Sequence, residues 1–359
     1  MLARSKEKLV ALLFDSDPSK AGCRLYEDAE QIWFCPAHSD QETIQQTLRE
    51  IENAAHRGAH IVLSMSFESY TAFSSAAHLP EINKPQANPE IPATPSLQAV
   101  AFRQMRLLDP KTALSWLDER STDVEIHLST PISAISEEQF HDNVADIRER
   151  IAAGQTYQVN LTYPYGSQLR AFVPPSSTDE IEHDRALYAA FAQLVRTVNV
   201  PYAGLLLMPE NSMLSFSPEL FFELDGLQLR ARPMKGTAPL GKTPEETEQL
   251  SLALSQDPKN RAENLMILDL LRNDVARLAQ TEHVSVPEKF VVKPYGTVLQ
   301  MTSTVQAELS AQPPLPELLD ALFPCGSITG APKHETIRII QEIEPYARGA
   351  YCGAIGYLE

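Results

Sequence analysis

Residues 220–237 read LFFELDGLQLRARPMKGT, in which Asp225-Gly226 joins two short apolar runs ahead of a basic segment. Apolar runs on both sides of Asp-Gly predict a β-hairpin with a type I′ turn, because glycine tolerates the positive φ that this turn requires. In that register Leu224 pairs with Leu227. We therefore expect antiparallel sheet in the middle of the chain.

Three charged side chains gather at the open end of the predicted hairpin. Glu219 falls opposite Arg232, and Lys235 follows roughly 10 Å further along if the chain stays extended. Gly236 removes a side chain where a ligand would approach the backbone closely. Taken alone, these residues are more typical of a surface salt-bridge cluster beside a turn.

The composition is that of an ordinary globular protein. The chain has 359 residues, 43% hydrophobic and 21% charged, enough for one large or two ordinary domains. A formal net charge of -17 argues against nucleic acid or anionic membrane as a partner, since proteins that bind them are usually basic. An anionic small molecule needs a locally positive pocket in so acidic a chain, which gives Arg232 and Lys235 added weight.

The cysteines and the N-terminal segment bear on the compartment. Four cysteines without C-x-x-C spacing predict a reducing cytoplasm rather than a disulfide framework or a zinc site. The apolar run at 9–14 follows a basic start but is too short for a signal peptide, so it predicts a first strand. No stretch approaches the length of a transmembrane helix.

Periodicity and capping signals place elements along the rest of the chain. Apolar spacing predicts a helix over 41–55, and Ser136 with Gln139 forms the capping box of a helix that Gly154 closes. The other predicted elements are a strand and its exit at 61–73, strands at 157–163, 202–208 and 213–217, a helix at 181–198 and a proline-rich loop at 80–95. Hairpins interleaved with helices, without a regular βαβ repeat, favour an α+β layered sandwich over a doubly wound sheet. We expect two lobes, residues 1–130 and residues 131–359.

The segment 257–274 predicts a helix that carries several charges. Asp257 is a natural N-cap and Pro258 suits the first helical position. The apolar residues that can be buried together are Leu265, Leu268, Leu271 and Val275. The charged residues left on the helix surface are Glu263, Arg272 and Asp274. Asp269 lies inside the apolar run, where a carboxylate needs a partner.

The segment 323–333 reads FPCGSITGAPK and leads into a helix with Ile337 and Ile340 facing inward. A Gly/Ser/Thr loop that ends with Pro332 at the first helical position presents free backbone N–H groups and the positive end of the helix dipole. This arrangement suits a carboxylate or a phosphate. A plain loop and helix cap would give the same pattern.

Five motifs in one order carry a resemblance to a known family. They are SPELF (217–221), RPMKGT (232–237), NRAENLMILDLLRND (260–274), GSITGAPK (326–333) and RGAYCGAIGY (348–357). With them the chain resembles the chorismate-utilising enzymes from about Ser136 to Glu359, with a weaker echo at 67–70. The resemblance implies an α+β sandwich of two intertwined subdomains with the site between them.

The same resemblance implies chorismate as substrate and Mg²⁺ as cofactor, with the ion bridging the ring carboxylate to glutamates. Glu263 matches the metal-binding glutamate of the family, and hard oxygen ligands suit Mg²⁺. The loop Gly326–Gly330 would hold a carboxylate by its backbone N–H groups. The substrate-binding residues that the resemblance implies are Arg232, Gln300, Gly326, Ser327, Thr329, Gly330, Lys333 and Tyr351.

Lys235 distinguishes between the subfamilies. Anthranilate synthases carry alanine there, whereas aminodeoxychorismate synthases carry P-I-K-G-T, similar to P-M-K-G-T in this chain. The resemblance implies amination of chorismate at C4 to 4-amino-4-deoxychorismate. In that reaction the Lys235 amine adds at C2 and displaces the C4 hydroxyl, which Glu219 protonates, and ammonia then adds at C4 and expels the lysine. The attacking amine must be neutral, and we expect Arg232 and partial desolvation to lower its pKa.

Three departures from the family pattern bear on this expectation. Gln300 stands where many relatives carry a histidine, and Cys325 stands where glycine or alanine is commoner. The chain also ends at Glu359, before an I-R pair, a Gly-rich turn and an E-x-x-E helix that relatives carry. Two interpretations are open. The sequence is a fragment of a longer protein, for example one that is fused to a lyase domain, or the chain is naturally truncated and inactive.

The expected partner is a glutamine amidotransferase that supplies ammonia for 4-aminobenzoate and folate synthesis. The alternatives are an anthranilate or isochorismate synthase-like enzyme, against the first of which Lys235 argues, and an inactive chorismate-binding fragment.

Overall fold

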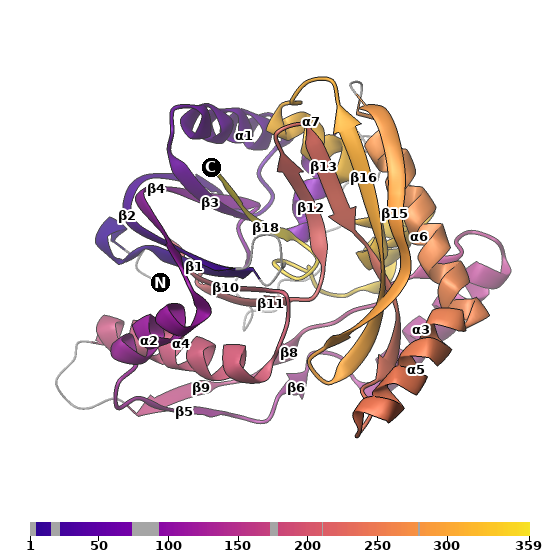
Figure 1. Cartoon of the computed structure of the whole chain (residues 1–359), viewed down its shortest axis with the longest axis horizontal. Coiled ribbons are helices and arrows are strands. Elements are labelled where there is room, and N and C mark those ends of the chain that lie inside the picture. The colour runs from indigo at the N-terminus through magenta and orange to yellow at the C-terminus, as the bar shows by residue number, and fades with distance from the viewer. Residues whose placement is uncertain (1–4, 16–21, 74–92, 173–178, 210, 279–280) are drawn as a thin grey trace.

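Two antiparallel sheets and the helices packed on them make up the computed structural model, which describes residues 5–15, 22–73, 93–172, 179–209, 211–278 and 281–359 (Figure 1). The seven-stranded sheet has, in spatial order, β11 (Met213–Ser217), β10 (Tyr202–Leu207), β1 (Val10–Asp15), β2 (Gly22–Cys35), β4 (Leu97–Leu108), β3 (His60–Met65) and β18 (Ala354–Leu358). The second sheet runs β12 (Leu220–Asp225), β13 (Gln228–Arg232), β16 (Val298–Leu309) and β14 (Met234–Pro239), and β15 (Thr281–Tyr295) also pairs with β16.

The helices are α1 (Gln41–His56), α2 (Pro110–Arg120), α3 (Glu137–Ala152), α4 (Asp179–Thr197), α5 (Pro244–Gln256), α6 (Pro258–Ala276), α7 (Leu315–Leu322) and α8 (Lys333–Ile343). Three short ribbons pair β5 (Glu125–Leu128) with β9 (Leu169–Phe172), β6 (Ile132–Ser133) with β8 (Tyr165–Gly166), and β7 (Gln158–Val159) with β17 (Gly330–Ala331). Within the described residues, no helix combines the length and the apolar character that crossing a membrane requires.

Helix α7 packs on both sheets, because its residues belong to a hydrophobic cluster on each of them. Leu315 and Leu319 of α7 belong to the cluster that α1 forms with β3 and β4. Leu318 and Leu322, on another side of α7, join the cluster that α6 forms with β13 and β16. A third cluster packs α2 and α4 on β1, β2 and β10. The sheets are therefore layers of one body, and the predicted α+β sandwich of intertwined parts is confirmed.

Strands from both sides of residue 130 lie in the seven-stranded sheet, because β10, β11 and β18 complete a sheet that β1 to β4 begin. The division into residues 1–130 and 131–359 stays a prediction.

Several local signals act as predicted. Asp257 caps α6 through Asn260 N–H, and Ser136 and Gln139 form the capping box of α3. Of the strand predicted over 157–163, only Gln158–Val159 forms, as β7, which pairs with β17. The prediction is wrong for the other residues of that range. Of the predicted loop at 80–95, residues 80–92 lie outside the described residues.

The hairpin forms with its turn one residue later than predicted. Asp225 pairs with Gln228, so Gly226 and Leu227 make the turn and the predicted pairing of Leu224 with Leu227 is wrong. Gly226 has φ +60 at the first turn position, and Leu227 at the second position is not among the residues of positive φ, which is typical of a type II′ turn rather than a type I′ turn.

At the open end of the hairpin, Leu220 rather than Glu219 lies opposite Arg232, beyond a register shift in β12. The predicted pairing of Glu219 with Arg232 is therefore wrong by one residue. Glu219 stands just before the strand, so its side chain is free of the alternation that the sheet imposes.

The buried face of α6 differs from the predicted one. Leu268, Leu271 and Val275 are buried, as predicted, but Leu265 is 50% exposed. Asn264 takes the place of Leu265 in the interior, with 1% exposure.

Two carboxylates of α6 were also placed wrongly by the sequence. Asp274, predicted on the surface, is buried and pairs with Lys333 of α8. Asp269, predicted to lie inside the apolar run, has a side chain 64% exposed, and the partner that it was predicted to need is Arg272, 3.4 Å away on the same helix.

A buried ion pair fixes the segment after α8. Arg348 and Glu344 have side chains 1% and 4% exposed and approach to 2.8 Å. The Arg348 guanidinium also donates to the carbonyl oxygens of Ile328, at 2.8 Å, and Asn160, at 2.6 Å. One side chain therefore ties the Gly/Ser/Thr loop to the segment that precedes β8.

The same segment is held from the first half of the chain. The Glu68 carboxylate accepts the backbone N–H groups of Arg348, at 2.7 Å, and Gly349, at 3.1 Å. The ring of Phe67 lies 4.7 Å from the Arg348 guanidinium carbon. Residues 67–70, which echo the family only weakly in sequence, thus contact the R-G-A-Y motif directly.

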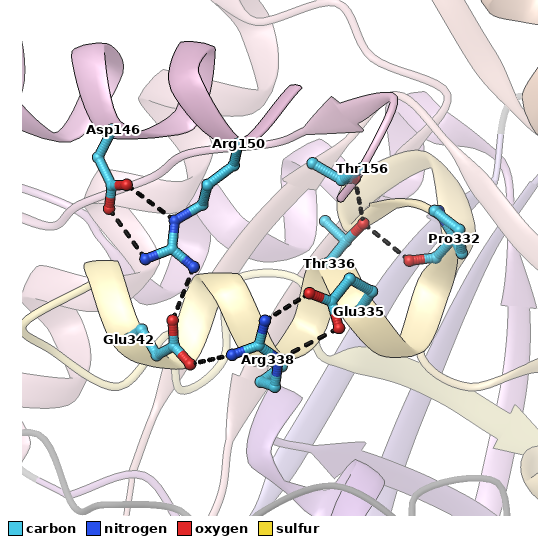
Figure 2. Close-up of polar contacts among 8 residues, drawn as sticks. All are labelled: Asp146, Arg150, Thr156, Pro332, Glu335, Thr336, Arg338 and Glu342. Carbon is cyan, nitrogen blue, oxygen red and sulfur yellow. Dashed lines mark hydrogen bonds and ion pairs between the residues drawn. The ribbon is translucent and has the colours of Figure 1, made fainter. Parts of the chain in front are cut away.

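An alternating chain of charges joins α3 to α8 on the surface (Figure 2). Arg150 of α3 lies 2.8 Å from Asp146 and 2.7 Å from Glu342 of α8. Arg338 continues the chain by pairing with Glu342 and Glu335 on its own helix.

Beneath this surface chain, two threonines fix the start of α8. Thr336 Oγ1 donates to Pro332 O at 2.8 Å and lies 2.9 Å from Thr156 Oγ1 (Figure 2). Pro332 is the N-cap of α8, one position earlier than predicted.

Replacing Arg348 with leucine leaves the buried Glu344 carboxylate without its ion-pair partner. We therefore expect the variant to lose about 3–5 kcal/mol of unfolding free energy. Urea titration followed by circular dichroism measures the loss. Arg338→Leu is the matched control, because its ion pairs lie at the surface and removing them costs about 0–1 kcal/mol. Equal losses in the two variants would contradict a special role for the buried pair.

Candidate active site

Lys235 lies at a bulge in β14. Met234 pairs with Thr302 and Thr237 with Gln300, so one extra residue of β14 is accommodated between these pairs. Bulges re-aim side chains and recur beside active sites.

Gly236 follows with φ +102. A Cβ at Gly236 would lie 3.2 Å from the Cβ atoms of both Asn260 and Met301. The space beside Gly236 is therefore filled by the protein, which corrects the prediction that a ligand approaches there.

The Glu219 carboxylate is held by the Gly/Ser/Thr loop. Ser327 Oγ donates to Glu219 Oε1 at 2.5 Å, and Cys325 Sγ lies 3.7 Å from the same oxygen. Although Glu219 as a residue is only half-buried, its carboxyl group is desolvated, and this burial raises its pKa to about 7. The Ser327 hydroxyl and the Lys235 ammonium act in the opposite direction.

Burial also lowers the pKa of Lys235 from its usual range. The charges of Glu219 and Glu263 oppose this lowering, so both carboxylates lie within electrostatic reach of the amine. Desolvation acts as predicted, whereas Arg232 is not among the main causes. The structure thus brings Glu219 and Lys235 together even though the predicted register was wrong.

Arg232 ends β13 and acts electrostatically on Tyr295. Burial raises the pKa of Tyr295, and the Arg232 guanidinium opposes that rise. Glu219 acts on the same tyrosine in the other direction, so Arg232 borders the Glu219 site on the Tyr295 side.

The loop at 326–330 is more self-contained than predicted. The N–H groups of Ile328 and Thr329 donate to Cys325 O, at 3.4 Å, and Gly326 O, at 3.3 Å, so the prediction of free N–H groups is wrong for these two. The Thr329 hydroxyl lies 3.2 Å from Cys325 O.

The backbone of β7 requires glycine at 330, and the Leu270 side chain of α6 crowds Gly326. A Cβ at Gly330, with φ +146, would lie 2.0 Å from Gln158 O. A Cβ at Gly326 would lie 1.9 Å from the Leu270 side chain. Close approach of β7 and α6 to the loop therefore accounts for its glycines.

Lys333 pairs with a buried carboxylate of α6. Its ammonium lies 2.5 Å from Asp274, and both side chains are 10% exposed. Burial raises the pKa of Asp274, and Lys333 opposes the rise. The pair joins α6 to α8, so the structure gives Lys333 an internal partner, and its predicted contact with substrate stays a prediction.

The remaining predicted residues lie around the Lys235 side of the site or at the surface. Gln300 Oε1 accepts from Thr237 Oγ1 at 2.9 Å. Tyr351 is 61% exposed in the turn after α8. The Glu263 side chain is 37% exposed, with its carboxylate 3.9 Å from Lys259 Nζ on the same helix.

Glu263 fits one ligand of a magnesium site. Mg²⁺ commonly takes one or two carboxylates and completes its shell with water and substrate oxygens. Among the described residues, no group of three His, Cys, Asp or Glu side chains is placed to hold a metal ion. Glu263 would therefore need the substrate and solvent as co-ligands.

Sequence reasoning missed Asn264, which supports the Lys235 backbone. Asn264 Nδ2 lies 3.3 Å from Lys235 O and 3.3 Å from Met301 O. Its spacing from Leu268 and Leu271 places it on the buried face of α6, a signal that a count of apolar residues alone overlooks.

Comparison with known proteins identifies the relatives of this chain. A family model described as chorismate binding enzyme matches residues 21–359. Aminodeoxychorismate synthase component 1 of Klebsiella aerogenes is 40% identical over 254 residues, 70% of this chain and 53% of that protein. Its counterpart in Escherichia coli K12 is 40% identical over 226 residues, 63% of this chain and 47% of that protein. An anthranilate synthase component 1 of Haloarcula marismortui is 36% identical over 266 residues, 73% of this chain and 51% of that protein.

Solved structures share the fold. Anthranilate synthase component I from Streptococcus pneumoniae superposes with a TM-score of 0.66 at 19% identity, over 100% of this chain and 80% of that chain. The menaquinone-specific isochorismate synthase of Escherichia coli gives a TM-score of 0.64 at 15% identity, over 100% of this chain and 78% of that chain.

The chain spans about half the length of the curated relatives that it matches. The family match nevertheless extends over nearly all of its residues, and the chain therefore belongs to the family of chorismate binding enzymes.

Proposed function

We propose that the protein aminates chorismate at C4 to give 4-amino-4-deoxychorismate. The observation that carries the proposal is the enclosed pair of Lys235 and Glu219, in which burial lowers the pKa of the amine and raises that of the carboxyl group. A nucleophile and a proton donor of this kind are what a displacement of hydroxide from the substrate requires. Similarity to the aminodeoxychorismate synthases supports the same reaction.

In the proposed reaction the neutral Lys235 amine forms a bond to C2 of chorismate. The ring double bond shifts, the C4–O bond breaks, and Glu219 donates its proton to the departing hydroxyl. Ammonia then forms a bond to C4, the double bond shifts back, and the C2–N bond to Lys235 breaks. A proton lost by the attacking ammonia balances the one that Glu219 gave, so Glu219 and Lys235 regain their starting forms.

Substrate binding is proposed for the residues that border this pair. Arg232, Gln300, Tyr351 and the loop at 326–330 would contact the carboxylates and hydroxyl of chorismate. Ser327 already donates to Glu219, so its hydroxyl would act on substrate only indirectly. Mg²⁺ held by Glu263 would neutralise the ring carboxylate when bound.

The name component 1 of the relatives supports a second component as partner, and we propose a glutamine amidotransferase that delivers ammonia for 4-aminobenzoate and folate synthesis. All four cysteines are free, which suits the proposed reducing cytoplasm. Formation of anthranilate or isochorismate instead of the aminated product would favour the alternative chemistry, and binding of chorismate without turnover would favour an inactive binding chain.

Lys235→Ala in the full-length polypeptide removes the proposed nucleophile, so we expect chorismate amination to fall on the order of 10³-fold or more. The assay supplies chorismate, Mg²⁺ and excess ammonium, with products separated by chromatography. Lys242→Ala, at an exposed position, controls for the loss of a positive charge. Undiminished amination by the Lys235 variant would refute the covalent role.

The pH dependence of kcat should be bell-shaped, because the reactive form carries one proton, on Glu219 rather than on Lys235. Below a pH of about 7 both groups are protonated, so activity should rise as pH passes the Glu219 pKa. The Ser327 hydroxyl lowers that pKa, and Ser327→Ala should therefore move the acid limb to higher pH. Ser285→Ala, whose hydroxyl lies 3.4 Å from Gln306 O, is the matched control. An acid limb that stays in place in the Ser327 variant would show that this hydrogen bond does not tune Glu219.

A further inference from the structure

The bulge at Lys235 interrupts the ladder between β14 and β16. Regular pairing stops after Met234 and resumes at Thr237, so Lys235 and Gly236 lie in a gap of the ladder. A bulged residue lacks its ladder partner, and a carbonyl left unpaired in the interior is destabilising because it has lost its hydrogen bonds to water. Something other than the sheet must satisfy the backbone at this point.

Helix α6 supplies that partner. Asn264 Nδ2 lies 3.3 Å from Lys235 O on one strand and 3.3 Å from Met301 O on the other, so a single amide bridges the gap. Asn260, one helical turn earlier, packs against Gly236. Two successive turns of α6 therefore contact Lys235 and Gly236, the two residues of the bulge.

The orientation of the bridging amide is fixed from its other end. Ser303 Oγ donates to Asn264 Oδ1 at 2.6 Å and accepts Phe290 N–H at 3.1 Å. Asn264 and Ser303 are 1% and 0% exposed, so water does not compete for these bonds. Since a carbonyl oxygen can only accept, the amide nitrogen must face Lys235 O and Met301 O.

Phe290 takes part in this network in a backbone conformation that is unfavourable for its residue type. It has φ +56, which is costly for a bulky aromatic residue, and it lies within a register shift of β15. Its N–H meets the Ser303 hydroxyl, and its ring lies 4.7 Å from the Arg261 guanidinium carbon on α6. Three strands and one helix thus converge on the hydrogen bonds that end at Lys235.

We infer that Asn264 is a positioning residue for Lys235: its amide holds the bulge in the one backbone conformation that keeps the amine buried beside Glu219. The inference rests on the proposed role of Lys235 as nucleophile. The preceding residue of the helix is Glu263, so the same turn of α6 sets both the backbone of the amine and a carboxylate that acts on it.

The experiment measures the Lys235 amine itself, independently of turnover. The full-length wild-type and Asn264→Leu proteins are acetylated with a trace of acetic anhydride between pH 6 and pH 11, and mass spectrometry gives the labelling rate of the Lys235 peptide at each pH. Leucine keeps the volume of the side chain without its hydrogen bonds. We expect the inflection of the labelling curve to move up toward the ordinary lysine value, because the released amine is less buried. The kcat for amination should fall by about 10²-fold, with a smaller change in KM.

Ser303→Ala tests the same network with less disturbance of the core, and should move the inflection in the same direction by a smaller amount. Asn273→Leu, on the exposed face of α6, is the matched control and should leave the inflection in place. An unchanged inflection in folded Asn264→Leu or Ser303→Ala protein overturns the inference. If the wild type fails to aminate chorismate while the inflection still moves in the variants, the proposed function fails and the positioning by Asn264 stands.

Discussion

A guanidinium that is 1% exposed must find partners for its donors inside the protein, and Arg348 does so by drawing three separate segments together. Glu344 neutralises its charge, while carbonyl oxygens of the Gly/Ser/Thr loop and of the segment before β8 take its remaining donors. Because the loop that holds Glu219 is one of these segments, the place of the proposed proton donor depends on this buried ion pair.

Burial acts on the two proposed reacting groups in opposite and useful directions. Removing water disfavours the charged form of each, so the same low-dielectric environment favours the protonated Glu219, which can donate a proton, and the neutral Lys235, which can act as a nucleophile. Their mutual attraction favours the charged forms and limits both shifts. A surface salt bridge, the simplest interpretation of these residues in the sequence, would have shown neither enclosure nor these shifts.

The sequence predicted best those features that depend only on residues close together in the chain. The N-cap of α6 and the capping box of α3 are local hydrogen bonds between residues three positions apart, so their signals are complete in the sequence. The hairpin register is not local, because β13 is paired on both sides and Leu227 O accepts Leu309 N–H from β16 at 2.9 Å. That distant bond places Leu227 in the turn.

In the candidate site, too, the sequence predicted the residues that belong to local motifs but not the distant contacts that hold them. Motifs named Lys235, Glu219 and Glu263, but the contacts that hold them come from other elements. Asn264 was overlooked because hydrophobic periodicity gives weight only to apolar residues, and its partners are backbone carbonyls, which leave no trace in a sequence. A polar residue at a core-facing helical position is the signal to look for, since burial obliges it to have partners.

The fold alone does not decide the reaction. Solved structures with TM-scores of 0.66 and 0.64 are named for anthranilate synthesis and isochorismate synthesis, at 19% and 15% identity. A shared backbone is therefore compatible with enzymes of different names. The bulge in β14 fixes where a side chain at position 235 points, and the amine found there adds a group that an alanine lacks. Under the proposed function, the scaffold would determine where bond formation occurs, and Lys235 at the bulge would make the protein, rather than a small molecule, the partner in the first bond.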